Sequence, residues 1–115
     1  MSVNEKKKIL DLCLGKAQSL TGLVDYADDS VVSKTLLDKS AGTLTLFAFA
    51  AGQGLSEHTS PYDATVHILD GKAQIVIDGE PIEVATGELI VMPADVPHSL
   101  TAQERFKMLL IMIRN

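Results

Sequence analysis

The 115-residue sequence predicts an all-β fold, an antiparallel sandwich or barrel preceded by a short helix. From residue 18 onward, short apolar or alternating segments are separated by Gly, Asp and Pro, and strong helical periodicity does not return. Two Asp-Gly pairs, Asp70-Gly71 and Asp78-Gly79, supply residues that tolerate positive φ and therefore indicate tight hairpins. Many short strands at near-regular spacing are typical of this fold class.

The N-terminal residues 1–17 are expected to form a helical arm. Asn4 can cap a helix, Ile9 and Leu10 belong to its apolar side, and Gly15 follows as a residue that ends helices.

The remaining elements are expected to be strands over residues 20–26, 31–37, 43–50, 64–69, 72–77, 82–84, 88–92, 99–102 and 106–113. Residues 43–50 and 106–113 are apolar on both faces. Because a strand in a lone barrel has one face in water, these two strands predict a second covering layer. The N-terminal helix, an additional strand or a second subunit could each provide it.

The charge, cysteine content and apolar segments of the chain indicate which partners and which location to expect. The net charge of −5 and the pI of about 5.0 repel phosphate backbones, so we expect no nucleic-acid partner. Cys13 is the single cysteine, which fits a reducing, cytoplasmic location. Asp11 interrupts the apolar run after the N-terminal lysines, and residues 108–113 are too few to cross a bilayer, so no membrane partner is expected.

The segment from Gly52 to Gly71 carries the first of two spaced motifs. It resembles the first motif of the cupins: glycine, five residues, His-x-His, three or four residues, glutamate, six residues, glycine. Gly52, His58 and Gly71 match in spacing, whereas Ser60 replaces the second histidine and Ala64 replaces the glutamate.

A second motif follows fifteen residues later. The cupin pattern of glycine, five residues, Pro-x-Gly, two residues, histidine, three residues, asparagine is matched by Gly87, Pro93 and His98. Asp95 stands where glycine is usual, which is tolerable because Asp enters the left-handed region more readily than most residues. Ala102 stands at the asparagine position.

The resemblance covers about residues 43–113 and implies a cupin-type double-stranded β-helix, a jelly-roll barrel. Residues 1–115 are then expected to form one cupin domain. Cupins commonly pair through their sheets, so the resemblance implies a homodimer, with cover by the chain's own first 30 residues as the alternative.

The resemblance also locates a pocket. A typical cupin metal site has three histidines and a carboxylate, donors that suit Fe, Mn, Ni, Cu or Zn. The corresponding positions here are His58, Ser60, Ala64 and His98, which leave two imidazoles and predict little or no bound metal.

His67 and Asp63 are the nearby residues that could complete the set of metal ligands, and strand parity argues against both. If Ala64 faces the barrel interior, then His67 points to the opposite face unless a bulge intervenes, and Asp63 has the same parity. Met92, Met108 and Met112 are expected to be apolar core residues and not soft ligands.

We therefore expect a barrel that binds a small organic ligand, with His58, Ser60, Tyr62 and His98 as polar anchors. The alternative is a metal-dependent cupin enzyme of dioxygenase or isomerase type, with His58 and His98 as metal ligands and Asp63, His67 or water completing the shell. A metal-free acid–base enzyme using both histidines is a third reading, because histidine titrates near neutrality. The plainer interpretation is that His98 satisfies a backbone carbonyl and that residues 59–61 form a turn.

Overall fold

A computed structural model describes residues 9–114. Its N-terminal part, which we call the arm (residues 9–30), has helical residues at 9–13 and a 3-10 helix, η1, at Leu20–Gly22. The expected cap at Asn4 lies outside the described residues. None of the described helices is of the length and apolar character needed to span a membrane.

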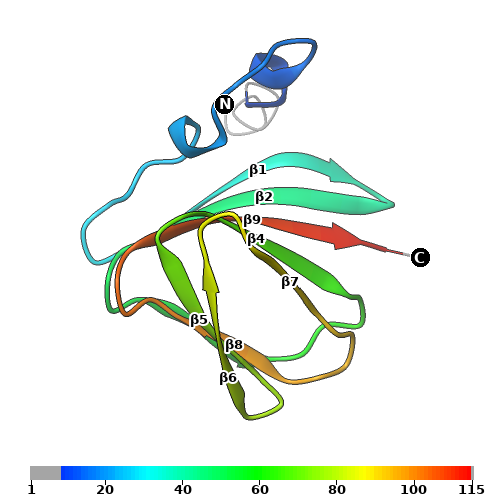
Figure 1. Ribbon diagram of the computed structural model, residues 1–115. Coiled ribbons are helices and arrows are strands. Elements are labelled where there is room, and N and C mark those ends of the chain that lie inside the picture. The colour runs from blue at the N-terminus through cyan, green and yellow to red at the C-terminus, as the bar shows by residue number, and fades with distance from the viewer. Residues whose placement is uncertain (1–8, 115) are drawn as a thin grey trace.

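Nine strands follow the arm and form two antiparallel sheets (Figure 1). The five-stranded sheet has the order β1-β2-β9-β4-β7, and the four-stranded sheet has the order β3-β8-β5-β6. The strands are β1 (Val31–Lys39), β2 (Gly42–Phe49), β3 (Gly54–His58), β4 (Ala64–Asp70), β5 (Lys72–Ile77), β6 (Glu80–Ala85), β7 (Leu89–Met92), β8 (His98–Thr101) and β9 (Phe106–Ile113). The predicted all-β fold class with antiparallel sheets is confirmed.

The two Asp-Gly pairs play different parts. Asp78 (φ 51°) and Gly79 (φ 81°) form the two-residue turn between β5 and β6, with positive φ at both positions as a type I′ hairpin requires. The hairpin expected at Asp70-Gly71 was wrong, because β4 and β5 belong to different sheets. Gly71 (φ 74°) instead lies at the corner where the chain passes from one sheet to the other.

The space between the sheets is an apolar core. Strand alternation directs Ala64, Val66 and Ile68 of β4 into it, each at most 1% exposed, as the parity argument predicted. Met92 and Met108 are buried there too, which confirms them as core residues. The other buried members are Phe49, Ala73, Ile75, Val84, Leu100, Ala102 and Phe106.

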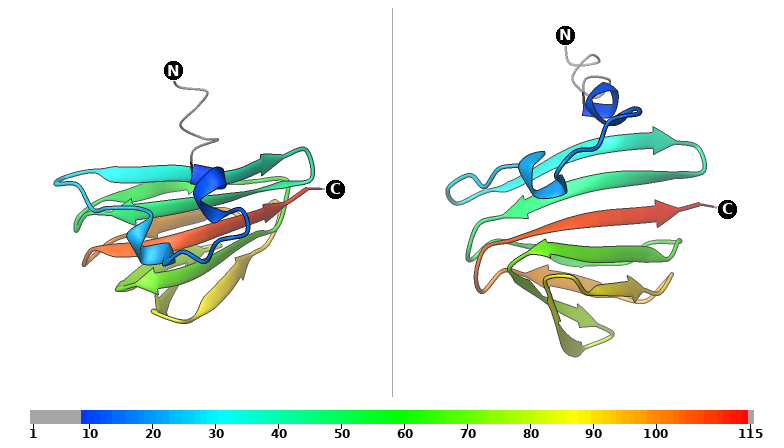
Figure 2. Two further views of the ribbon diagram at one scale, coloured as in Figure 1. Left: turned by 90° about the horizontal axis from the view of Figure 1, so that it is seen from above. Right: turned by 45° about the horizontal axis from the view of Figure 1, so that its top comes forward.

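The arm covers part of the opposite face of the five-stranded sheet, which we call the outer face (Figure 2). Val24 of the arm is fully buried in a second apolar cluster with Leu36, Leu46 and Ala48. The predicted covering layer is thus provided in part by the chain itself. Its extent is limited, since Leu89, Val91 and Ile113 on the same face are 63%, 46% and 70% exposed.

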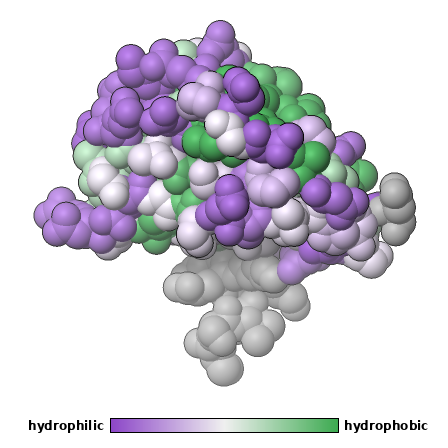
Figure 3. Space-filling view, turned by 90° about the horizontal axis from the view of Figure 1, so that it is seen from below, coloured by the Kyte–Doolittle hydropathy of each residue, from purple (hydrophilic) through white to green (hydrophobic). Residues whose placement is uncertain are grey.

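The exterior of the four-stranded sheet is largely polar. Lys72 lies 3.7 Å from a carboxylate oxygen of Glu83 and 3.8 Å from one of Glu104. Seen from below, the molecule shows hydrophilic and neutral surface with hydrophobic residues gathered mainly toward one side (Figure 3). The two sheets therefore differ in what they offer to a partner.

Two element predictions were wrong. Residues 20–26 form no strand, because Leu20, Leu23 and Val24 recur at helical spacing and turn together onto the outer face. Strand β3 was missed, because it is an edge strand whose residues are mostly exposed and whose pairing with β8 is interrupted by a register shift between Leu55 and His58.

Candidate functional site

His58 and His98 meet at one end of the barrel. His58 is the last residue of β3 and His98 the first of β8, and the two are directly paired across the strands. Their ring centroids lie 4.4 Å apart with an interplanar angle of 68°, an edge-to-face arrangement. The two cupin motifs therefore bring their remaining histidines together in space.

Each imidazole has one ring nitrogen engaged by the backbone. Nδ1 of His58 lies 2.7 Å from the carbonyl oxygen of Ser56, and Nδ1 of His98 lies 3.1 Å from that of Val96. Because a carbonyl can only accept, both Nδ1 atoms carry the proton and both Nε2 atoms keep a lone pair in the neutral rings. The plainer interpretation of His98 is thus correct for Nδ1 and leaves Nε2 available.

The two rings differ in their exposure to water. His98 is 3% exposed and shares the inward side of β8 with Leu100, whereas His58 is an exposed residue on the edge strand. The pair consequently has one buried member and one at the rim. A ligand that contacts both would enter from the His58 side and reach inward to His98.

Two loops next to the histidines are joined by two hydrogen bonds, one between backbone groups and one from the backbone to a carboxylate. The Asp95 N–H donates to the Ser60 carbonyl at 2.7 Å, and the Ala94 N–H donates to Asp63 Oδ1 at 2.8 Å. Asp95 has φ 63°, the left-handed conformation expected for the residue at the usual glycine position. These bonds fix the 59–63 loop against the loop that leads into His98.

Ser60 lies within this junction. Its Oγ accepts a hydrogen bond from the Tyr62 N–H at 3.2 Å, beside a bend at residues 61–62, slightly further along the chain than the turn expected at residues 59–61. The Ser60 hydroxyl proton has no part in that bond, and Ser60 is half-buried. It can therefore still donate to a ligand.

The donor set does not fit a complete cupin metal site. Ala64 is 1% exposed and paired with Met92 and Met112, so the position of the family's carboxylate belongs to the apolar core. His67 lies on the outer face between Leu89 and Leu109, as parity predicted. Within residues 9–114, no group of three or more His, Cys, Asp or Glu side chains is placed to hold a metal ion.

Tyr62 lines a hollow that neither His58 nor His98 lines. The hollow has a volume of about 380 Å³ and opens on the outer face. The other residues around this hollow are Pro61, Asp63, Thr65, Val91, Ala94, Ile111 and Ile113. Of the four predicted ligand anchors, the structure thus groups His58 and His98 closely, puts Ser60 in the adjoining loop, and associates Tyr62 with another surface.

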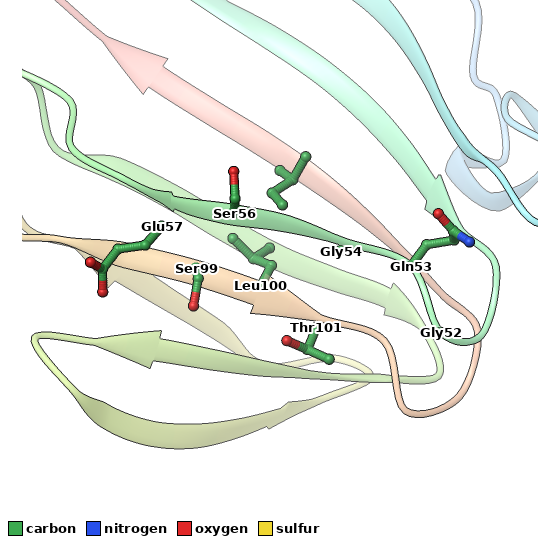
Figure 4. Close-up of a pocket in the computed structure, with 9 residues that line it drawn as sticks. Gly52, Gln53, Gly54, Ser56, Glu57, Ser99, Leu100 and Thr101 are labelled. Carbon is green, nitrogen blue, oxygen red and sulfur yellow. The ribbon is translucent and has the colours of Figure 1, made fainter.

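A second hollow, of about 390 Å³, lies along β3 and β8 (Figure 4). It is open and mixed in character, and its lining residues are Gly52, Gln53, Gly54, Leu55, Ser56, Glu57, Ser99, Leu100 and Thr101. Figure 4 shows the side chains of Ser99 and Thr101 on the same side of β8. Sequence reasoning missed this surface, since β3 itself was not predicted.

Fold and motif geometry define a small β-barrel protein with a paired-histidine end. The family model for the cupin domain matches residues 45–113, and the chain belongs to the cupin family.

Several solved structures resemble the chain closely. A conserved protein of unknown function from Streptococcus pyogenes, SPY1581, is 43% identical, with a TM-score of 0.83 over 87% of this chain and 88% of that one. The cupin superfamily protein DSY2733 from Desulfitobacterium hafniense is 29% identical, with a TM-score of 0.83 over 87% and 92% of the two chains. KdgF from Halomonas is 17% identical, with a TM-score of 0.68 over 87% and 96%, which shows the shared fold alone. No curated protein matches the sequence.

Proposed function

We propose that this cupin barrel binds a small polar organic molecule at the His58–His98 end, with little or no metal. The observation that carries the proposal is the arrangement of the imidazoles, whose centroids are 4.4 Å apart and whose Nδ1 atoms are both occupied by carbonyls. The Nε2 atoms of both histidines, at the same end of the barrel, can hydrogen-bond to one ligand.

The chemistry of this pair indicates the class of ligand. A neutral imidazole with Nδ1–H accepts a hydrogen bond at Nε2, so it suits a hydroxyl group. A protonated imidazole donates from Nε2 and suits a carboxylate, and charge assistance strengthens that bond. A small hydroxy acid or a sugar acid offers both groups, and Ser60 can add a further donor.

The proposal is tested on tag-free protein by histidine-ring NMR, using glycolate and glucuronate as probes and ethanol as the control that has a hydroxyl group but no carboxylate. We expect the two acids to shift the Nε2 resonances of His58 and His98, and we expect a His58→Ala/His98→Ala double variant to lose any change in melting temperature that the acids cause. Acids that leave both rings unperturbed at millimolar concentration contradict the proposal.

The second candidate is a metal-dependent cupin enzyme of dioxygenase or isomerase type. One observation favours it: metal-ligating histidines usually donate their other ring nitrogen to a carbonyl or carboxylate, as both histidines do here. His58 and His98 would then hold Fe, Mn, Ni, Cu or Zn, and the metal would supply Lewis acidity, with water or further donors in the remaining positions.

Elemental analysis separates the two candidates. Near-stoichiometric metal in wild-type protein that is lost from the His58→Ala/His98→Ala variant supports the enzyme and refutes the metal-poor binding protein. Absence of metal after reconstitution with each of Fe, Mn, Ni, Cu and Zn refutes the enzyme.

We also propose that the protein is a cytoplasmic homodimer that pairs through the uncovered part of the outer face. Support comes from Leu89, Val91 and Ile113, large apolar side chains exposed on β7 and β9, the two strands that flank β4 in the five-stranded sheet. Light scattering should give twice the 12.3 kDa chain mass. A Val91→Glu/Ile113→Glu variant should give the chain mass, and a wild-type monomer at micromolar concentration contradicts this part of the proposal.

A further inference from the structure

Four side chains fasten the arm to the barrel at the end where β4 finishes and β9 begins. They are Tyr26 of the arm and Asp70, Arg105 and Lys107 of the barrel, and we call them the anchor cluster. The Tyr26 hydroxyl donates to Asp70 Oδ2 at 2.6 Å. Tyr26 and Asp70 are 44 residues apart in sequence, so this bond joins the arm directly to the barrel.

Two cations complete the cluster around the tyrosine ring. The Arg105 guanidinium lies 4.4 Å from the ring centroid and the Lys107 ammonium 4.9 Å, both within the range of cation–π attraction. Burial first, and then the hydrogen bond and negative charge of Asp70, raise the pKa of Tyr26 well above its ordinary value. The hydroxyl therefore remains a donor across the neutral range.

Lys107 is the unusual member of the cluster, because a charged side chain on the outer face is only 9% exposed there. Its Nζ donates to the Thr21 carbonyl in the arm at 2.6 Å. A buried ammonium without partners is strongly unfavourable, so the position of the arm decides whether this charge is satisfied within the fold or by water.

Apart from the anchor cluster, the arm is attached through the apolar cluster around Val24, against which its other apolar residues pack while only partly buried: Ile9, Cys13, Leu20 and Leu23. Among residues 9–30, Val24 alone is fully buried, and residues 14–19 are all exposed. The part of the arm that leads from Tyr26 to β1 includes the exposed Ala27, Asp28 and Asp29, and Asp29 has φ 54°. A segment with few buried contacts, followed by an exposed connection, can open locally while the rest of a domain stays folded.

We propose that residues 9–26 form a strap that opens and closes on the outer face, and that the anchor cluster determines its closed position. When closed, the strap covers Leu46, Ala48 and Leu109, so that the exposed apolar part of the sheet is confined to the end with Leu89, Val91 and Ile113. When open, it uncovers these apolar residues as well, while the barrel stays intact.

The strap lies far from the ligand site. β4 runs from Ala64 near the 59–63 loop to Asp70 in the anchor cluster, so the cluster lies at the opposite end of the strands from that loop. The inference therefore stands or falls separately from the ligand-binding proposal.

Hydrogen exchange measured by mass spectrometry tests the strap in the full-length protein. We compare peptides from residues 9–26 with peptides from β2 and β9 in wild type, Tyr26→Phe and Lys107→Met, with Lys39→Met as a matched control at an exposed position on β1. In wild type the strap should exchange faster than the two strands. In Tyr26→Phe and Lys107→Met the strap should exchange about tenfold faster still, the factor expected for losing one strong hydrogen bond.

The strands should exchange at wild-type rates in Tyr26→Phe, which changes no barrel residue, and Lys39→Met should leave the strap unchanged. Parallel acceleration of strap and strands would show that the arm opens only when the barrel unfolds, and the inference would be overturned. A strap that exchanges at the wild-type rate in both Tyr26→Phe and Lys107→Met would overturn the inference as well, since the anchor cluster would then not stabilise the closed position.

Discussion

Replacing Gly71 with alanine should destabilise the protein far more than the same change at Gly79. Both glycines follow an aspartate and both have positive φ, 74° and 81°. They differ in what a methyl group would meet. At Gly79 no atom lies within 4 Å of an added Cβ, whereas at Gly71 the Cβ would overlap the Arg105 carbonyl oxygen and lie 3.2 Å from both Cα and Cβ of Phe106.

The magnitude follows from separating two costs. An alanine in the left-handed region costs about 1–2 kcal/mol, and this applies at both positions. The gain from restricting the unfolded chain, about 0.4–1 kcal/mol, also applies to both and cancels in the comparison. At Gly71 the backbone of β9 must move as well, and such overpacking costs about 1–3 kcal/mol. Gly71→Ala should therefore be less stable than Gly79→Ala by about 1–3 kcal/mol.

Urea unfolding followed by far-UV circular dichroism measures this difference. The two variants share the same substitution and the same backbone region, so each serves as the other's control. Equal unfolding free energies, within about 0.5 kcal/mol, would show that the corner between the sheets relaxes freely and would refute the reasoning. Failure of Gly71→Ala alone to fold would agree with the prediction at its extreme.

Three further predictions follow from the described contacts. Since the pKa of Tyr26 is raised in the folded state, the contribution of its hydroxyl to stability is complete below about pH 10 and is lost as the pH rises. In urea titrations, the difference in unfolding free energy between wild type and Tyr26→Phe should therefore shrink above pH 10, by at most about 1.4 kcal/mol per pH unit. A difference that stays constant with pH would contradict this. In ¹⁵N NMR, the neutral rings of His58 and His98 should both be Nδ1–H tautomers, and an Nε2–H tautomer at either would contradict the hydrogen bonds to carbonyls. Phe106→Ala should lower the unfolding free energy by about 3–5 kcal/mol, because Phe106 is fully buried with its centroid 4.5 Å from that of Phe49; a loss below 1 kcal/mol in urea unfolding would show that the core closes around the vacancy.

Strand alternation made most of the barrel predictable. The bounds of β5 and β9 agree with the segments expected at 72–77 and 106–113, because both strands are apolar enough for the pattern to be read. At Asp70-Gly71 the local turn chemistry was read correctly, since Gly71 does have positive φ. What local chemistry could not indicate is whether the next strand returns to the same sheet or enters the other one.

The placement of the histidines was predictable and that of Tyr62 was not, for a physical reason. His58 and His98 are held by strand pairing between β3 and β8, so motif spacing carries over into distance. Tyr62 belongs to a loop whose path depends on long-range hydrogen bonds. One example is the bond from the Ala94 N–H to the Asp63 carboxylate, which joins residues 31 positions apart in sequence. No pattern within the loop itself specifies that partner, so the direction of the tyrosine could not be inferred.

The two changed ligand positions have unequal consequences, which bears on how the site should be understood. Ser60 keeps a polar group in a half-buried turn, so the surroundings of that position still suit hydrogen bonding. Ala64 is different, because it is packed between Met92 and Met112 in the core, and a carboxylate there would be buried among apolar neighbours. A charge in such a place is tolerated only with a compensating partner. One side of the family's metal position is thus part of the apolar core, while on the other side the Nε2 atoms of both histidines keep their lone pairs. This asymmetry supports the proposal of a polar organic ligand over that of a fully coordinated metal.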